Sequence, residues 1–361
     1  MRGALLSLLR VLTSVPTAPF CETAVTRRTL SWLRRNLGRR VRIRRLRGGL
    51  IVSYRGAGPG PALALAAHLD HPGFRLQAVT TKGARAVLQG NHPRHLLPGC
   101  LVEAFPAAPG GNRPAAIGRL GPRPKRGDAF ALTWTVPPRP RAKLAFGVLA
   151  LTPCAMRAGW LSSRSLDDLL GCAIALETLR RAVRARLRCN LKVLLHRAEE
   201  VGFVGALDFA RRGRVAPEDS IVSLEASRAL PGARPGRGPV IRLGDRAVLF
   251  DANLLALLDD SAAALAKRGV PVQRRRLTGG TCEATAYQAF GYEAAGVAVP
   301  LVNYHNGIGA KSIAAEMVRV ADVAGCVRLL YEAARRFPAA ALRGHWRRRL
   351  ERRQRRSERL L

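Results

Sequence analysis

The sequence predicts an α/β protein in which a mostly parallel central sheet is covered by helices. From residue 160 onward, helical patterns of apolar residues alternate with short apolar strand patterns. Such alternation is typical of parallel strands joined by crossover helices. Residues 76–159 break the pattern, because they are rich in Gly and Pro and contain only short strand-like pieces. This segment therefore predicts a small β-rich insertion.

The part before the insertion contains two predicted helices and three predicted strands. The helices, at 3–15 and 22–37, are separated by a break at Pro16–Pro19. Residues 41–55 indicate a hairpin of two strands. The small apolar residues at 62–67 then predict a strand that is buried on both faces and ends in His68-Leu69-Asp70.

Beyond the insertion, helices and strands are expected in alternation. The predicted helices are 167–184, 203–212, 251–268, 279–290 and 311–336, and the predicted strands are 190–196, 220–225 and 294–304. We therefore expect one α/β domain from residues 1–75 and 160–340, with 76–159 inserted into it. Residues 341–361 form a separate basic tail.

The charge balance allows two interpretations. The 361 residues include 61 Lys and Arg against 24 Asp and Glu, a formal net charge of +37. Such an excess is expected of proteins that neutralise phosphates. However, arginine is abundant along the whole chain, only 5% of residues are aromatic, and no basic-aromatic ladder for base stacking stands out. The composition therefore disfavours nucleic acid as a partner.

The cysteines and the apolar segments bear on where the protein works. The seven cysteines are odd in number and widely spaced, and they contain no Cys-x-x-Cys pair. We expect them to be reduced thiols of a cytoplasmic protein. No apolar stretch approaches the length of a membrane span.

Polar side chains recur at the carboxyl ends of the predicted strands, where open α/β sheets form their sites. They are His68 and Asp70, Asp167 and Asp168, Glu199 and Glu200, Glu225, and His305. One of the two aspartates is explained equally well as a helix cap, and the two adjacent glutamates as a solvated turn. Taken together, two imidazoles and several carboxylates favour a site for Zn²⁺ or a similar divalent ion.

A centre with two metals needs a shared carboxylate and about two further ligands for each ion. It also needs a carboxylate that binds no metal and acts as general base. The adjacent Glu199 and Glu200 offer one of each.

Five motifs resemble, in order, those of the dinuclear-metal aminopeptidases of the glutamyl, deblocking and tetrahedral aminopeptidase group. They are AHLDHPGF (67–74), SLDDLLGC (165–172), AEEVGFVGA (198–206), TGGTCEATAY (278–287) and NYH (303–305). The resemblance covers almost the whole chain. It implies a zinc exopeptidase-like fold in which 76–159 is a small β-barrel-like domain that takes part in assembly into a homo-oligomer.

The resemblance also implies a role for each site residue. It makes Asp167 the ligand that bridges two divalent ions, with zinc, cobalt and manganese as the candidates. Glu200 and His305 would complete one ion's ligands, and His68 and Glu225 those of the other. Glu199 would be the general base. Asp70 would accept the second ring N–H of His68 and fix its tautomer.

The sequence departs from the family pattern at four places. Glu225 stands where the family usually has Asp, and His71-Pro72 replaces an acidic-apolar pair. Cys282-Glu283 stands where Asp-Ala is usual, and Leu169 where a polar residue is common. Because the expected ligands and base remain, these changes concern substrate specificity more than chemistry.

The function we expect is removal of N-terminal residues from peptides by a metal-dependent aminopeptidase. One alternative is a metal-dependent carboxypeptidase or N-acyl amino acid deacylase of the same fold. The other is a catalytically degenerate protein that binds nucleic acid or an anionic surface through its basic residues.

Overall fold

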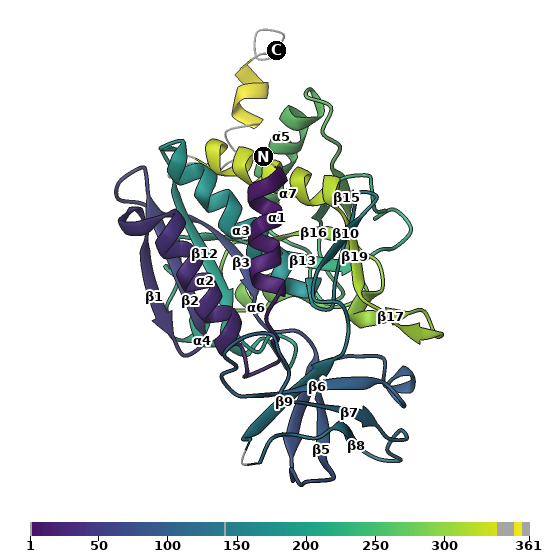
Figure 1. The fold of residues 1–361 in the computed structure, drawn as a ribbon. Helices are drawn as coiled ribbons and strands as arrows, with labels where there is room; N and C mark the ends of the chain where they lie inside the picture. Colours follow the sequence, from purple (N-terminus) through teal and green to yellow (C-terminus); the bar gives the residue numbers. More distant parts are fainter. Residues whose placement is uncertain (1, 141, 338–349, 356–361) are drawn as a thin grey trace.

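Eight strands form the central sheet of the computed structural model, which describes residues 2–140, 142–337 and 350–355 (Figure 1). In spatial order they are β1 (Arg42–Leu46), β2 (Gly49–Arg55), β12 (Asn190–His196), β3 (Leu63–His68), β13 (Ser220–Arg228), β16 (Ala294–Leu301), β14 (Val240–Arg242) and β15 (Gln273–Arg275). The four central strands β12, β3, β13 and β16 are parallel. The predicted α/β class with a mostly parallel central sheet is confirmed.

The central strands are apolar because both faces of the sheet are covered. Every residue of β3 and of β16 is buried, as expected for parallel strands between helical layers. The register pairs His68 at the end of β3 with His196 at the end of β12. The segments that follow these strands therefore leave the sheet at the same edge.

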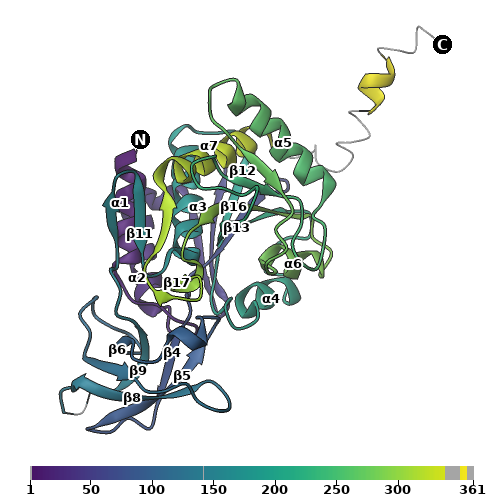
Figure 2. The same cartoon turned by 90° about the vertical axis from the view of Figure 1, so that its right-hand side faces the viewer.

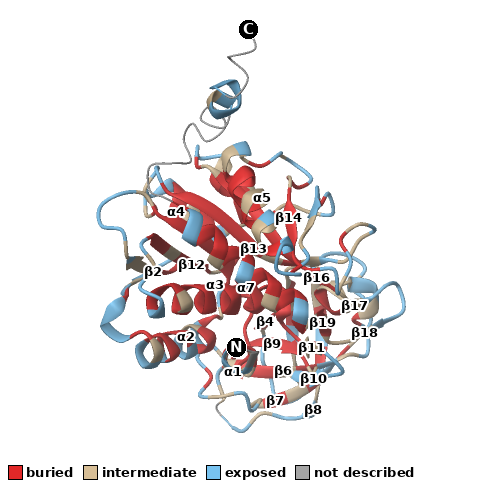
Figure 3. Ribbon diagram, turned by 90° about the horizontal axis from the view of Figure 1, so that it is seen from above, coloured by how far each residue is buried: buried red, intermediate tan, exposed pale blue. Residues whose placement is uncertain are grey.

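Helices cover both faces of the sheet (Figure 2). On one side lie α1 (Arg2–Thr13), α2 (Thr23–Asn36), α3 (Leu166–Arg184) and α7 (Val320–Arg336), and on the other α4 (Val204–Arg211) and α6 (Glu283–Gln288). The remaining helix, α5 (Ala252–Ala266), packs on α7. Helix α3 is buried almost all round, because the sheet lies on one side of it and α1 and α7 on the other (Figure 3).

Six strands between Gly73 and Leu149 close into a barrel below the central sheet in Figure 1. In order around the barrel they are β4 (Gly73–Gln77), β5 (Gly83–Gln89), β8 (Ala129–Val136), β7 (Ala116–Leu120), β6 (Leu101–Pro106) and β9 (Leu144–Leu149). Phe74, Phe130 and Leu132 fill its interior. The barrel-like insertion is thus confirmed, and the division at residues 76 and 159 stays a prediction.

The predicted helix at 311–336 is wrong in its first part. Residues 307–319 contain β17 (Gly307–Ile308), β18 (Ser312–Ile313) and β19 (Glu316–Arg319), and the helix begins only at Val320. Strand β19 pairs with β11 (Trp160–Ser163), which pairs with β10 (Ala155–Arg157). Pairing with a segment about 150 residues away overrides the local helical pattern.

The described residues contain no helix with the length and apolar character needed to cross a bilayer. All seven cysteines lie in the described part of the chain, and none of them is in a disulfide. Of the predicted tail, residues 350–355 are helical, and 341–349 and 356–361 lie outside the described residues.

Candidate metal centre

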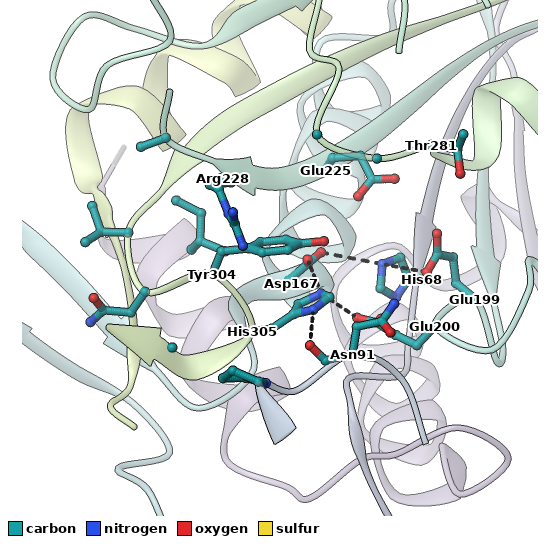
Figure 4. Close-up of a pocket in the computed structure, with 18 of the residues that line it drawn as sticks. His68, Asn91, Asp167, Glu199, Glu200, Glu225, Arg228, Thr281, Tyr304 and His305 are labelled. Atoms are coloured by element: carbon teal, nitrogen blue, oxygen red, sulfur yellow. Dashed lines mark hydrogen bonds and ion pairs between the residues drawn. The ribbon is translucent and has the colours of Figure 1, made fainter. Parts of the chain in front are cut away.

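Six of the seven predicted site residues lie together at the edge of the sheet where the parallel strands end (Figure 4). These six line one pocket of about 940 Å³: His68, Asp167, Glu199, Glu200, Glu225 and His305. The seventh, Asp70, is fully buried and contacts the backbone of Glu199 and Glu200. Parallel strands therefore bring together residues that are up to 237 positions apart in the sequence.

Asp167 lies between the two imidazoles. Its Oδ1 is 3.5 Å from His68 Nε2, and its Oδ2 is 3.4 Å from His305 Nε2. Two groups of ligand atoms, each within 4.8 Å of one another, share this aspartate. One group adds His68 and Glu225, and the other adds Glu200 and His305. A shared carboxylate between two ligand groups is the arrangement that a pair of metal ions requires.

The donor set fits divalent cations. Asp167 Oδ1 and Glu200 Oε1 are buried and accept no hydrogen bond from the described residues. Burial is the largest cause that raises the pKa of Glu225 to about 8, and it also raises the pKa of Glu199 well above its usual range. Buried carboxylates without enough donors are costly, and cations offset this cost. Imidazole and carboxylate ligands suit zinc and similar ions.

Asp70 fixes the backbone of the two adjacent glutamates. Its Oδ1 accepts a hydrogen bond from the Glu199 N–H at 3.0 Å, and its Oδ2 accepts one from the Glu200 N–H at 3.1 Å. The nearest partner of His68 Nδ1 is the backbone carbonyl of Asp70 at 3.2 Å, with the carboxylate at 3.5 Å. Either contact leaves His68 Nε2 facing Asp167.

Asp168 makes a cap-like contact inside α3, where the backbone of Asp167 and Asp168 departs from helical angles. Its Oδ1 accepts a hydrogen bond from the Gly171 N–H at 3.0 Å. Its Oδ2 is 3.4 Å from the His68 N–H, so the same side chain ties the start of α3 to the end of β3. Asp167 is thereby left facing the pocket.

Two groups that hold site residues in place were not predicted from the sequence. Glu316, fully buried in β19, accepts hydrogen bonds from the backbone N–H groups of Leu166, Asp167 and His305 at 2.7, 3.0 and 3.0 Å. The carbonyl of Asn91, in the barrel insertion, lies 3.0 Å from His305 Nδ1. Glu316 lay in a segment predicted as helix, and a backbone carbonyl gives no residue-type signal.

The departures from the family motifs have structural roles. Neutral His71, whose pKa is lowered by burial, contacts the Asp167 carbonyl through Nδ1 and Asn306 through Nε2. Glu283 forms a buried pair with His196, with 2.6 Å between Oε1 and Nδ1. Leu169 is packed in the main hydrophobic core.

The pocket also carries aromatic and basic groups. The Tyr304 ring stacks on His305 with 3.8 Å between the ring centroids. The Arg228 guanidinium lies 5.3 Å from the centroid of the Tyr304 ring. Arg246 and the backbone of Gly279 and Gly280 line the same pocket.

The family model of M42 glutamyl aminopeptidases matches residues 144–329 of the chain. This match covers β9 through most of α7, and it includes five of the six pocket residues named above.

Solved structures share the fold over nearly the whole chain. The TET aminopeptidase of a Thaumarchaeota archaeon from marine sediment is 18% identical, with 94% of this chain and 99% of that chain covered and a TM-score of 0.78. The aminopeptidase APDkam598 of Desulfurococcus kamchatkensis is also 18% identical, with 94% and 96% covered and a TM-score of 0.77. The TET1 peptidase of Pyrococcus horikoshii is 21% identical, with 91% and 99% covered and a TM-score of 0.72.

Proposed function

The chain belongs to the M42 glutamyl aminopeptidase family and is therefore a peptidase, and we propose that it removes N-terminal residues from peptides at a centre of two divalent ions. The observation that carries this proposal is the position of Asp167, which belongs to two of the three candidate groups of ligand atoms among the described residues. Glu199 forms the third group with His68 and Glu200, and its Oε2 lies 3.8 Å from His68 Nε2. The two groups around Asp167 are complete without Glu199, which leaves this carboxylate available as a base.

We assign each ion three protein ligands. His68 and Glu225 would hold one ion, Glu200 and His305 would hold the other, and Asp167, which belongs to both of these groups, would serve both ions. The longer Glu225 side chain serves where the family usually has Asp, because it lies within ligand distance of His68 and Asp167. Together with Glu199, the three carboxylate ligands carry a formal charge of four, which two divalent ions would balance.

When bound, such ions polarise the carbonyl of the scissile peptide bond and make water more acidic. Glu199 accepts a proton from the attacking water and returns it to the leaving amine. Burial, the largest cause, raises the pKa of Glu199. A carboxyl whose pKa lies closer to neutral is better suited to do both steps. Asp70 keeps Glu199 in place through its backbone N–H.

We also propose that the protein forms a homo-oligomer. The Pyrococcus horikoshii TET1 peptidase, which has the same fold, assembles into a tetrahedron or a large octahedral shell. The net charge of +37 opposes close approach of identical subunits at low salt. Mass photometry at several salt concentrations measures the mass of the assembly directly. A single species at the mass of one chain under all conditions contradicts this part of the proposal.

The decisive experiment compares peptides that differ only in their N-terminus. Chelator-treated protein is supplied with Zn²⁺, Co²⁺ or Mn²⁺ and incubated with each peptide in free and acetylated form. We expect metal-dependent release of the first residue from the free form only. Cleavage of acylated substrates alone would show a deacylase instead, and release of the last residue a carboxypeptidase. Inactivity with every metal would refute the proposed function.

A further inference from the structure

Glu22 is a buried carboxylate at the start of α2, and it contacts the chain just before Glu199. It is fully buried. Its Oε1 accepts hydrogen bonds from the backbone N–H groups of Phe20 and Ala198, both at 2.9 Å. Its Oε2 accepts one from Arg197 Nε at 2.7 Å. One side chain from the N-terminal region thus holds two consecutive residues of the segment that leads to the metal centre.

Both residues held by Oε1 have backbone conformations that side chains disfavour. Phe20 has φ of +67° and Ala198 has φ of +53°. Residues other than glycine adopt such angles at a cost that their surroundings must compensate. The shared hydrogen bonds to a carboxylate supply this compensation, because bonds to a charged acceptor are stronger than neutral ones.

The same pattern continues into the site. Asp70 accepts hydrogen bonds from the N–H groups of Glu199 and Glu200. Two buried carboxylates therefore hold three consecutive backbone N–H groups, at Ala198, Glu199 and Glu200. The left-handed turn at Ala198 sets the direction in which the chain leaves β12, and hence where the two glutamate side chains point.

We propose that Glu22 is a positioning residue for catalysis, which fixes the turn at Ala198 and so aims Glu199 and Glu200 at the metal centre. This inference rests on the proposed function, in which Glu199 is the base and Glu200 a ligand. Glu22 does not line the pocket, and its side chain contacts Phe20, Arg197 and Ala198. Arg197 supports it by pairing with its Oε2 and by donating a hydrogen bond from Nη2 to the Phe20 carbonyl.

The test is Glu22→Gln in the full-length protein. The amide offers one acceptor oxygen in place of two, so it loses either the Arg197 contact or the two backbone contacts. We expect kcat to fall about 10- to 100-fold, the range found when supports of metal ligands are removed. KM should stay within about twofold, because the pocket wall is unchanged. Zinc affinity, measured by competition with a chromophoric chelator, should weaken in the same direction through Glu200.

A second substitution separates positioning from plain stability. Glycine adopts positive φ without strain, so Ala198→Gly in the Glu22→Gln background should restore part of the lost kcat. The matched control is Glu177→Gln, because Glu177 is also fully buried and paired with Arg180 and Arg181, but in α3 away from the site. We expect the control to lower the melting temperature and to leave kcat unchanged.

The inference is overturned if Glu22→Gln lowers stability like the control while kcat and zinc affinity stay at wild-type values. It is also overturned if Ala198→Gly restores nothing. Should Glu22→Gln fail to fold, Arg197→Met tests the same support from its partly exposed partner, and unchanged kcat there counts against the inference. A wild-type protein that is inactive with every metal would instead refute the proposed function, since the variants are compared with active wild type.

Discussion

Replacing Glu316 by glutamine should loosen both sides of the metal centre at once. The carboxylate accepts three backbone hydrogen bonds, two through Oε2 from Leu166 and Asp167 and one through Oε1 from His305. In Glu316→Gln, the amide oxygen can keep the two bonds of Oε2, and the amide NH₂ then faces the His305 N–H. The variant therefore loses one hydrogen bond to a charged group and leaves a buried donor without an acceptor.

The size of the effect follows from these contacts. A hydrogen bond to a charged group contributes about 1.5–3 kcal/mol, and an orphaned buried donor costs about 1–3 kcal/mol. Burial and then the charge of Asp167 raise the pKa of Glu316, so removal of the charge also relieves repulsion. We therefore expect the free energy of unfolding to fall by about 2 kcal/mol. Zinc affinity should fall about 10- to 100-fold, because the backbone N–H of His305 loses its acceptor.

Thermal unfolding and chelator competition measure the two quantities. The control is Asp322→Asn, since Asp322 is equally buried and its carboxylate also accepts backbone hydrogen bonds, from Gly236 and Gly238. The control should lose stability without losing zinc affinity. If Glu316→Gln binds zinc as tightly as wild type, the reasoning that Glu316 positions the ligands is refuted.

Three further predictions concern the same centre. Glu199→Gln should bind zinc nearly as wild type and lower kcat by about 10²- to 10⁴-fold, so unchanged peptide hydrolysis would rule out this base. Asp70→Asn keeps one acceptor oxygen in place of two for the N–H groups of Glu199 and Glu200. We expect kcat to fall about 10- to 100-fold, and an unchanged kcat in steady-state kinetics would contradict this. Glu225, with its pKa raised from 4.5 to about 8 by burial first and Asp167 second, binds its proton more tightly in the folded chain. The stability it contributes is complete below about pH 4.5 and is lost as the pH rises to 8. The free energy of unfolding of chelator-treated protein should therefore fall over this pH range, and zinc should offset the fall. Denaturant unfolding measures it at several pH values with and without zinc. The same dependence on pH in both samples would contradict the prediction.

Much of the centre was predictable because its residues follow apolar runs. His68 ends a wholly buried strand, and Glu225 interrupts another, so each is conspicuous by its type and place. Because β3 and β13 pair in parallel, their carboxyl ends lie at the same edge of the sheet. The general lesson is that the ends of buried parallel strands can be recognised locally, although the strands themselves pair over long distances.

What escaped prediction depends on tertiary contacts. Glu316 sits in a run that favours helix locally, and pairing of β19 with β11 decides otherwise. Glu22 belonged to the predicted helix 22–37, where nothing distinguishes a buried carboxylate from a solvated one. Strand β14 and the edge strand β15 have three residues each, too few for a periodic pattern.

The contact between Asn91 and His305 limits how modular the insertion is. The barrel has its own hydrophobic interior, which by itself indicates a module that can be exchanged or removed. Yet the carbonyl of Asn91, which lies beyond β5 of the barrel, holds the ring nitrogen of His305 opposite the one that faces Asp167. A chimera that carried a relative's barrel would therefore need to reproduce this one carbonyl, or it would lose the contact that orients His305, a proposed ligand more than 200 residues away in the chain.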